Sequence, residues 1–123
     1  MTLGSLDGEN ISVITLNRPE VYNALDDESG FALLQTFGAA SEDDSVRCIV
    51  ITGAGKAFCS GEDLGALADG YRSGEAPDLG RTVEDRYNPL IRAIRNAPKP
   101  VVAAVNGVAA GAGASIALAC DFR

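Results

Sequence analysis

The sequence lacks histidine entirely and has few cysteines. Without histidine, this stretch of chain cannot contain a Ser-His-Asp triad, a histidine-ligated zinc site or imidazole acid–base chemistry. The three cysteines, Cys48, Cys59 and Cys120, are odd in number and unrelated in spacing. They predict neither a disulfide framework nor a metal site, and they favour a reducing, cytoplasmic location.

Positive charge is also scarce. Ten Lys and Arg residues stand against 17 Asp and Glu, giving a net charge of −7, and no basic block occurs. This balance argues against nucleic acid and anionic membrane as partners. The first ten residues, MTLGSLDGEN, contain no basic and apolar signal peptide. A phosphorylated small molecule is still compatible with an acidic chain if backbone amides supply the positive potential.

What the sequence does have is apolar content. Of its 123 residues, 46% are hydrophobic, which is enough for the core of one modest domain. Three strands are predicted. Residues 11–19 alternate between apolar and polar side chains, residues 46–55 form a continuous apolar run closed by glycines, and residues 99–105 form a third strand. Because helical patterns separate these strands, we expect an α/β fold with parallel pairing, one domain over residues 1–123 and no internal repeat.

The first helical pattern follows the first strand. Asp26 or Asp27 can cap a helix in which Phe31, Leu34 and Phe37 recur every three residues, close to helical spacing. The spacing predicts a helix that begins at these aspartates.

The second helical pattern follows a segment without periodicity. Residues 64–81 predict either a mobile surface loop or a lid or pocket wall. Beyond them, Thr82 and Asp85 resemble a capping box, and Pro89 predicts a kink. An apolar stripe at i, i+4, i+7, i+8 and i+11 predicts the helix itself. Its members are Val83, Tyr87, Leu90, Ile91 and Ile94.

The most unusual segment, NGVAAGAGASIALA at 106–119, consists mainly of alanine and glycine and has no charge. It lies within Val101–Cys120, an uncharged run of the length that crosses a bilayer. However, Asn106-Gly107 is a turn signal, and the VVAAV segment before it favours a strand. We therefore expect a strand, a turn and a helix over residues 109–120 rather than a membrane span.

A dinucleotide-binding loop is a second interpretation of the glycines. The segments around Gly53 and Gly111 each resemble part of the G-x-G-x-x-G pattern. Phe58 and Ile116 stand where the third glycine belongs, so neither segment completes it.

A third interpretation uses the backbone itself. The N-terminus of a helix exposes unpaired N–H groups and a partial positive charge, and small residues leave a ligand free to approach them. If an oxygen of the ligand gains negative charge during a reaction, these amides stabilise the transition state. Close packing of the helix is a second use of the same small residues.

Four segments in register resemble the crotonase superfamily of enoyl-CoA hydratases and isomerases. They are ITLNRPEVYNAL, GKAFCSGEDL, APKPVVAAVNG and NGVAAGAGASIALACD. The resemblance begins at Ile11 and continues to the last residue. It implies a spiral of β-β-α units, of which residues 1–123 form the N-terminal half, so that this part alone is expected to be inactive. It also implies an acyl-CoA substrate, no separate cofactor, and a homotrimer or dimer of trimers.

The resemblance assigns roles to residues of two motifs. In the family, two backbone N–H groups hold the thioester oxygen, and the matching positions here are Glu62 and Ala112. The Glu62 side chain is expected to be solvated, and Cys59 beside it to be a small buried thiol. Coenzyme A would follow a path along the surface that includes both motifs. Its residues are Tyr22, Ser60, Gly61, Glu62, Asp63, Leu64, Val108, Ala109, Ala110, Gly111 and Ala112.

One position departs from the hydratase pattern. Hydratases of the family carry a glutamate at the position of Ser115, which here lines the predicted substrate site, and a second carboxylate that would lie beyond Arg123. The chain most resembles the isomerases of phenylacetate degradation that rearrange a ring-epoxide. The resemblance therefore favours an isomerase of an unsaturated or epoxidised acyl-CoA. An enoyl-CoA hydratase and a non-catalytic nucleotide-binding module are the alternatives.

Overall fold

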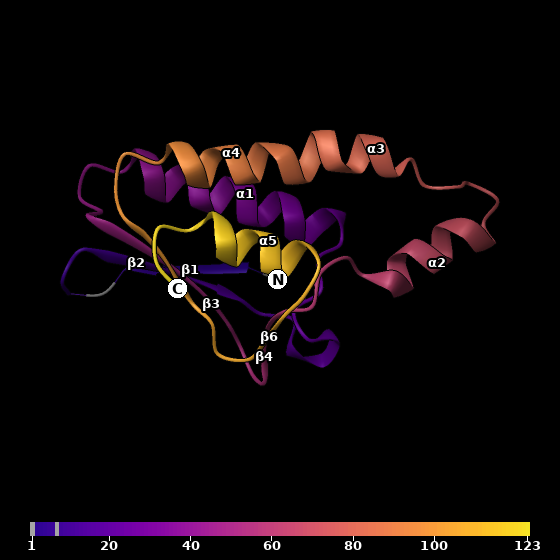
Figure 1. Ribbon diagram of the computed structural model, residues 1–123, viewed down its shortest axis with the longest axis horizontal. Helices are drawn as coiled ribbons and strands as arrows, with labels where there is room; N and C mark the ends of the chain where they lie inside the picture. The colour runs from indigo at the N-terminus through magenta and orange to yellow at the C-terminus, as the bar shows by residue number, and fades with distance from the viewer. Residues whose placement is uncertain (1, 7) are drawn as a thin grey trace.

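The computed structural model, which describes residues 2–6 and 8–123, contains three β-β-α units in succession (Figure 1). The first unit is β1 (Thr2–Leu6), β2 (Ile11–Leu16) and α1 (Asp27–Glu42); the second is β3 (Cys48–Gly53), β4 (Ala57–Cys59) and α4 (Asn88–Asn96); the third is β5 (Val101–Ala104), β6 (Val108–Ala109) and α5 (Ala112–Ala119). The helices α2 (Leu64–Arg72) and α3 (Leu79–Thr82) lie between β4 and α4, and a 3-10 turn, η1, spans Pro19–Val21. The units repeat in structure although no repeat is visible in the sequence.

The strands form two sheets. The larger sheet has the order β1-β2-β3-β5, and β2, β3 and β5 run parallel, as the sequence predicts. The strand β1 pairs antiparallel with β2. The smaller sheet consists of β4 and β6, also parallel. The strands β1, β4 and β6 were not predicted from the sequence; β4 and β6 have three and two residues, too few to show a period.

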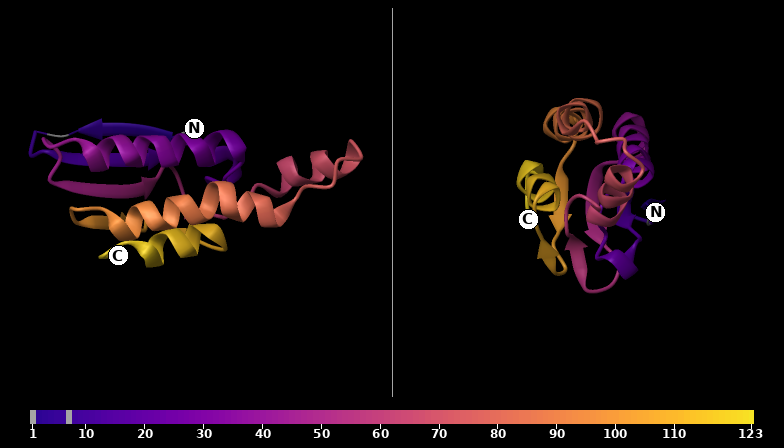
Figure 2. Two further views of the ribbon diagram at one scale, coloured as in Figure 1. Left: turned by 90° about the horizontal axis from the view of Figure 1, so that it is seen from above. Right: turned by 90° about the vertical axis from the view of Figure 1, so that its right-hand side faces the viewer.

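The core lies between the larger sheet and the helices that cover it. Figure 2 shows α1 and α4 side by side above the sheet, with α5 next to α4. On α1, Leu33 and Phe37 are fully buried, but Phe31 is 46% exposed. The predicted helix is confirmed, but its buried stripe runs through Ser29, Leu33 and Phe37 at i, i+4 and i+8, and Phe31 lies outside it. Asp26 is the N-cap and accepts a hydrogen bond from the Ser29 amide.

The prediction of a loop over residues 64–81 is wrong for most of this segment, because α2 and α3 lie there; only residues 73–78 between them are irregular. Asp63 caps α2 by accepting hydrogen bonds from the amides of Gly65 and Ala66. None of the α2 residues is buried, and Figures 1 and 2 show α2 projecting away from the rest of the chain. A helix without a buried stripe has no apolar periodicity to reveal it.

The helix that carries the apolar stripe begins earlier than predicted. Asp78, rather than Thr82, caps it by accepting a hydrogen bond from the Arg81 amide, and no capping box forms at Thr82. The chain then passes through a π-helical segment, η2 (Val83–Tyr87), into α4. Pro89 lacks the N–H that an α-helical bond requires, and the change from π to α geometry just before it lets the helix continue.

The expected strand, turn and helix are present as β5, the segment after it and α5, but the short strand β6 occupies residues 108–109, so the helix begins at Ala112 and not at residue 109. Over residues 2–6 and 8–123, no helix is long and apolar enough to cross a bilayer. The glycine–alanine run packs tightly against the segment around β4. A Cβ on Gly107 would lie 1.9 Å from the Lys56 carbonyl oxygen, and one on Gly113 would lie 2.1 Å from that of Cys59. The prediction that small residues permit close packing is therefore confirmed.

Substituting Gly113 tests this packing. We expect Gly113→Ala in the whole protein to lower the free energy of unfolding by about 1–3 kcal/mol, because α5 must move away from β4. The matched control is Gly38→Ala on α1, where a new Cβ meets nothing within 4 Å. That variant should gain about 0.5–1 kcal/mol from helix propensity. Chemical denaturation measures both, and a Gly113→Ala protein as stable as the wild type would contradict the close contact.

Candidate active site

Two unpaired backbone amides meet where β4 and the start of α5 approach each other. Glu62 follows β4, and Ala112 is the first residue of α5. Between them, the Cα of Gly61 lies against the other segment: a Cβ there would be 3.0 Å from the Ala110 oxygen and 3.5 Å from the Ala112 nitrogen. Gly61 also has a φ of +102°, which side chains rarely allow. The close approach therefore depends on glycine at position 61.

The pairing of the neighbouring residues leaves the Glu62 amide free. Leu25 donates to the Gly61 oxygen at 2.7 Å, and Asp63 donates to the Leu25 oxygen at 2.9 Å. In this parallel bridge the N–H of Glu62 points away from Leu25. Within the described residues, neither the Glu62 nor the Ala112 amide donates a hydrogen bond. The Ala112 amide belongs to the first turn of α5, where such groups are left unpaired and carry positive partial charge.

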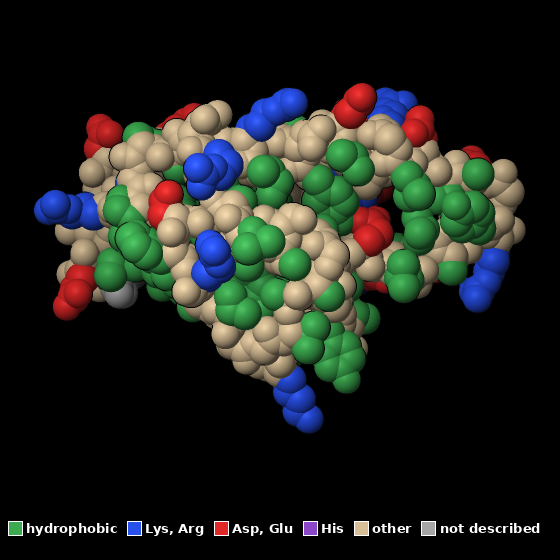
Figure 3. Space-filling view, viewed as in Figure 1, with side chains coloured by type: hydrophobic (Ala, Val, Ile, Leu, Met, Phe, Trp, Pro, Cys, Tyr) green, Lys and Arg blue, Asp and Glu red, His purple; other side chains and the backbone are tan. Residues whose placement is uncertain are grey.

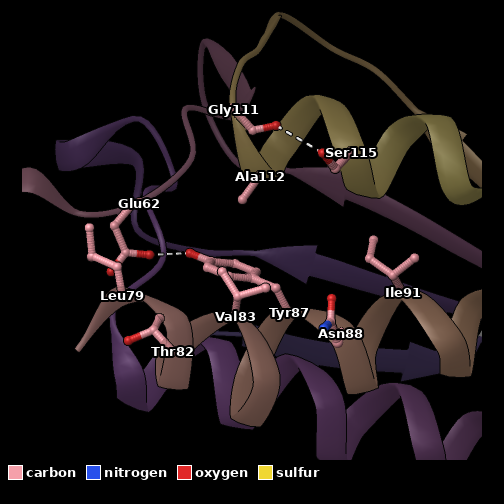
Figure 4. A pocket seen from close by; sticks show the side chains of 10 residues that line it. All are labelled: Glu62, Leu79, Thr82, Val83, Tyr87, Asn88, Ile91, Gly111, Ala112 and Ser115. Carbon is pink, nitrogen blue, oxygen red and sulfur yellow. Dashed lines mark hydrogen bonds between the residues drawn. The ribbon is translucent and has the colours of Figure 1, made fainter.

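These amides adjoin a cavity of about 510 Å³ between α4 and α5, here called the α4–α5 cavity (Figure 4). Its lining residues are Glu62, Leu79, Thr82, Val83, Tyr87, Asn88, Ile91, Gly111, Ala112 and Ser115. Figure 4 shows the Ala112 methyl group pointing toward the Tyr87 ring across the cavity. The walls are mainly apolar, and Figure 3 shows hydrophobic side chains gathered over α5 and along its boundary with α4. Such a cavity suits an apolar group whose reacting oxygen reaches the amides.

The Glu62 side chain is not simply solvated, contrary to expectation. It is 26% exposed, and its Oε2 accepts hydrogen bonds from the Tyr87 hydroxyl and, at 3.0 Å, from Arg86 Nη1. The Arg86 side chain is only 4% exposed and also pairs with Asp27, Nη2 to Oδ1, at 2.5 Å. One end of the α4–α5 cavity is therefore polar: Glu62 and Tyr87 line it, and the buried Arg86, which does not line it, contacts both.

Tyr87 is held in its neutral form by this environment. Burial raises the pKa of the Tyr87 phenol far above its usual range, and the hydrogen bond to the Glu62 carboxylate raises it further. The hydroxyl is therefore a hydrogen-bond donor throughout the neutral and mildly basic range.

The predicted coenzyme A residues lie around the outside of this site. The Tyr22 carbonyl accepts a hydrogen bond from the Ser60 amide at 3.1 Å, and the Tyr22 side chain is 59% exposed. Leu64 and Val108 are also exposed. The pairing of β4 with β6 places the strand residue Ala109 beside Cys59. The structure thus gathers the two predicted motifs on one edge, and four of the predicted residues line the cavity: Glu62, Gly111, Ala112 and Ser115.

Asp63 has a structural task at this edge. It caps α2 and pairs with Arg18 at 2.9 Å. Although burial alone would raise it, the pKa of the Asp63 carboxyl is lowered by the Ala66 amide and by Arg18. Cys59 is 0% exposed, which confirms the prediction of a buried thiol, and burial raises the pKa of that thiol.

The opposite wall of the cavity was not predicted from the sequence. The stripe residues Val83, Tyr87 and Ile91, which predicted a helix, line the cavity, and Val83 is 44% exposed. Tyr87 and Ile91 also pack against the core from their other side. Leu79 also lines the cavity, so the alternative of a pocket wall within residues 64–81 is confirmed for that residue. Tyr87 was predicted as a member of the apolar stripe, but nothing in the sequence signalled its hydrogen bond to Glu62 or the role of Arg86 beside it.

The raised pKa of Tyr87 predicts a pH-dependent stability. A phenol whose folded pKa exceeds its unfolded value of about 10 stabilises the fold fully below that pH, and the contribution is lost as pH rises through the folded pKa. The difference in unfolding free energy between wild type and Tyr87→Phe should therefore be constant up to about pH 10 and fall above it. Tyr71→Phe, at a tyrosine 57% exposed, is the control. An unchanging difference through pH 11 would contradict the assignment.

Comparison with known proteins gives one consistent family. The model of the family described as Enoyl-CoA hydratase/isomerase matches residues 7–123. The chain is 48% identical over 114 residues to 1,2-epoxyphenylacetyl-CoA isomerase of Escherichia coli (strain K12), covering 93% of this chain and 43% of that protein. It is 49% identical over 113 residues to a Rhodobacter capsulatus protein named "Probable enoyl-CoA hydratase", covering 92% of this chain and 41% of the relative. The chain thus spans less than half the length of these relatives.

Solved structures agree with the fold. An enoyl-CoA hydratase from Mycobacterium smegmatis superposes with a TM-score of 0.85 at 36% identity, over 98% of this chain and 45% of that one. An enoyl-CoA hydratase from Polaromonas sp. JS666 gives 0.81 at 41% identity, over 98% and 46%. The predicted spiral of β-β-α units is confirmed by these likenesses. With motifs, fold and sequence in agreement over nearly its whole length, the chain belongs to the enoyl-CoA hydratase/isomerase family, the crotonase superfamily.

Proposed function

We propose that the whole protein is an isomerase of an unsaturated or epoxidised acyl-CoA. In this proposal, the Glu62 and Ala112 amides hold the thioester oxygen as it becomes an enolate. The observation that carries the proposal is the pair of unpaired amides beside the α4–α5 cavity. Preorganised donors aimed at a developing negative charge stabilise a transition state without titrating side chains.

The surroundings of the amides support an acyl-CoA substrate. The apolar α4–α5 cavity would take the acyl group, and the exposed edge from Tyr22 through Ser60 to Val108 would take coenzyme A. Coenzyme A enters as part of the substrate, so the proposed reaction needs no separate cofactor. A homotrimer or dimer of trimers belongs to the same proposal, as the resemblance to the family implies.

Isomerisation is favoured over hydration by the residue at position 115. In the hydratases of the family a carboxylate at this position orients the attacking water. Here the residue is Ser115, which is exposed and whose hydroxyl lies 3.4 Å from the Gly111 carbonyl oxygen. A hydroxyl is a far poorer proton acceptor than a carboxylate near pH 7. One of the similar proteins is named an isomerase, which agrees with this choice. Enoyl-CoA hydration is the second candidate, since other relatives are named hydratases.

The oxyanion hole can be tested by removing one amide. Deleting such a donor costs about 2.7–4 kcal/mol of transition-state stabilisation, or about 10²–10³ in kcat. Ala112→Pro in the whole protein should lose that much, because it removes the N–H at a helix position that tolerates proline. Glu62→Gln should lose far less, because it retains its amide and a side-chain oxygen that can accept from Arg86 and Tyr87. Thermal melts control for folding, and equal losses in kcat would refute the assignment to backbone amides.

The reaction type can be tested at Ser115. We expect the whole protein to convert a β,γ-unsaturated or ring-epoxide acyl-CoA with a much higher kcat/KM than it hydrates crotonyl-CoA. Ser115→Ala should keep the isomerase activity, because the hydroxyl supplies no proton acceptor. Ser115→Glu should raise the rate of crotonyl-CoA hydration by adding the missing carboxylate. Efficient hydration by the wild type would overturn the isomerase proposal while leaving the family membership intact.

A nucleotide-binding module without catalysis makes a different prediction for binding. Calorimetry with a CoA thioester and with NAD separates the two. The proposed function requires binding of the thioester and none of NAD.

A further inference from the structure

We propose that Arg86 is a positioning residue that fixes the direction of the Glu62 amide, and that Gly30 is required to admit it. This inference rests on the proposed function, because it concerns the same oxyanion hole. Arg86 lies in η2, is buried and does not line the α4–α5 cavity, so it is not expected to touch the substrate.

The Arg86 guanidinium contacts both residues of the bridge that orients this amide. Its Nη1 donates to Glu62 Oε2 at 3.0 Å and to the Leu25 carbonyl oxygen at 3.4 Å. That carbonyl accepts from the Asp63 amide, while the Leu25 amide donates to the Gly61 oxygen, which shares a peptide plane with the Glu62 N–H. Leu25 therefore holds the peptides on both sides of the Glu62 Cα, and its position sets the direction of the Glu62 N–H. Arg86 therefore holds Glu62 from its side chain and Leu25 from its backbone.

Further contacts hold the guanidinium itself. Its Nη2 pairs with Asp27 Oδ1 at 2.5 Å, and its Nη1 lies 3.3 Å from the Tyr87 hydroxyl. The guanidinium carbon lies 5.0 Å from the centre of the Tyr87 ring. Because Tyr87 also donates to Glu62, three side chains form a closed set of hydrogen bonds behind the amide.

The burial of Arg86 needs an explanation other than stability. Its side chain is 4% exposed, and its Nε has no partner within the described residues. Removing a guanidinium from water is costly, and buried ion pairs are often no more stable than apolar residues of the same size. The segment η2 is π-helical. Such segments are rare in proteins, and those that occur are often found at functional sites. A role in holding the Glu62 peptide explains both the burial of Arg86 and the π-helical geometry of η2.

The helix α1 is shaped to admit this side chain. A Cβ on Gly30 would lie 2.3 Å from Arg86 Cδ and 2.9 Å from Arg86 Cγ. Glycine inside a helix lowers stability by about 0.5–1 kcal/mol relative to alanine. The need for space beside the Arg86 side chain explains why glycine stands at position 30 despite this loss. A Cβ on Gly38 of the same helix would meet no atom within 4 Å, so that position provides a matched control.

The test combines kinetics with the infrared carbonyl band of a bound acyl-CoA labelled with ¹³C at the thioester carbon. In the whole protein, hydrogen bonds from the two amides should shift this band to lower frequency than in free acyl-CoA. Gly30→Ala should lose part of the shift and reduce kcat about tenfold to a hundredfold with KM changed less than twofold, since a misplacement near 1 Å can cost that much. Gly38→Ala should keep both the shift and kcat.

Variants of the ion pair complete the test. Arg86→Lys keeps the charge but cannot hold Glu62 and Asp27 with one planar fork, so it should reproduce the effects of Gly30→Ala. If Gly30→Ala fails to fold, Arg86→Lys and Glu62→Ala decide: both must lose part of the band shift, whereas Glu62→Gln should retain more of it. A wild-type complex without any shift would overturn the proposed oxyanion hole. A wild-type shift that persists in folded Gly30→Ala or Arg86→Lys, with kcat unchanged, would overturn only the role of Arg86.

Discussion

The contact between the backbone around β4 and the backbone that leads into α5 is the constraint on which the rest of the structure depends. At Gly61, Gly107 and Gly113 a single added carbon would come within 3.0, 1.9 and 2.1 Å of a carbonyl oxygen of the facing segment. Because no side chain separates the segments, β4 and β6 can pair and α5 can begin beside Glu62. The same absence of side chains leaves two amides uncovered. Fold and candidate site therefore share one cause.

The electrostatics of the site come from the backbone rather than from cationic side chains. The chain as a whole is acidic, with a net charge of −7. The cation that contacts Glu62, Arg86, is paired with two carboxylates, Glu62 and Asp27. What faces the α4–α5 cavity is the first turn of α5, whose unpaired amides carry a fixed partial charge. A fixed partial charge of this kind can favour a transient enolate without binding every anion strongly.

Much of the fold follows from the sequence, as particular elements show. The strands β2, β3 and β5 have alternating or continuous apolar residues, and the cap at Asp26 depends only on residues next to it in the sequence. These elements were therefore predicted correctly. The helix α2 was not, because none of its residues is buried and it therefore carries no apolar period. The strands β4 and β6 were missed because their pairing is decided by contact between segments about fifty positions apart in the chain.

The candidate site divides in the same way. The sequence by itself determined that Glu62 and Ala112 belong to glycine-rich motifs, since only small residues at 61, 111 and 113 suit exposed backbone amides. It also determined that no histidine and no carboxylate at position 115 take part in the chemistry of this stretch of chain. Only the tertiary structure decided that the Glu62 carboxylate is held by Arg86 and Tyr87, and that Val83 and Ile91 line a cavity. The physical reason is that a motif records local backbone geometry, whereas an ion pair or a cavity wall depends on which distant helix packs beside it.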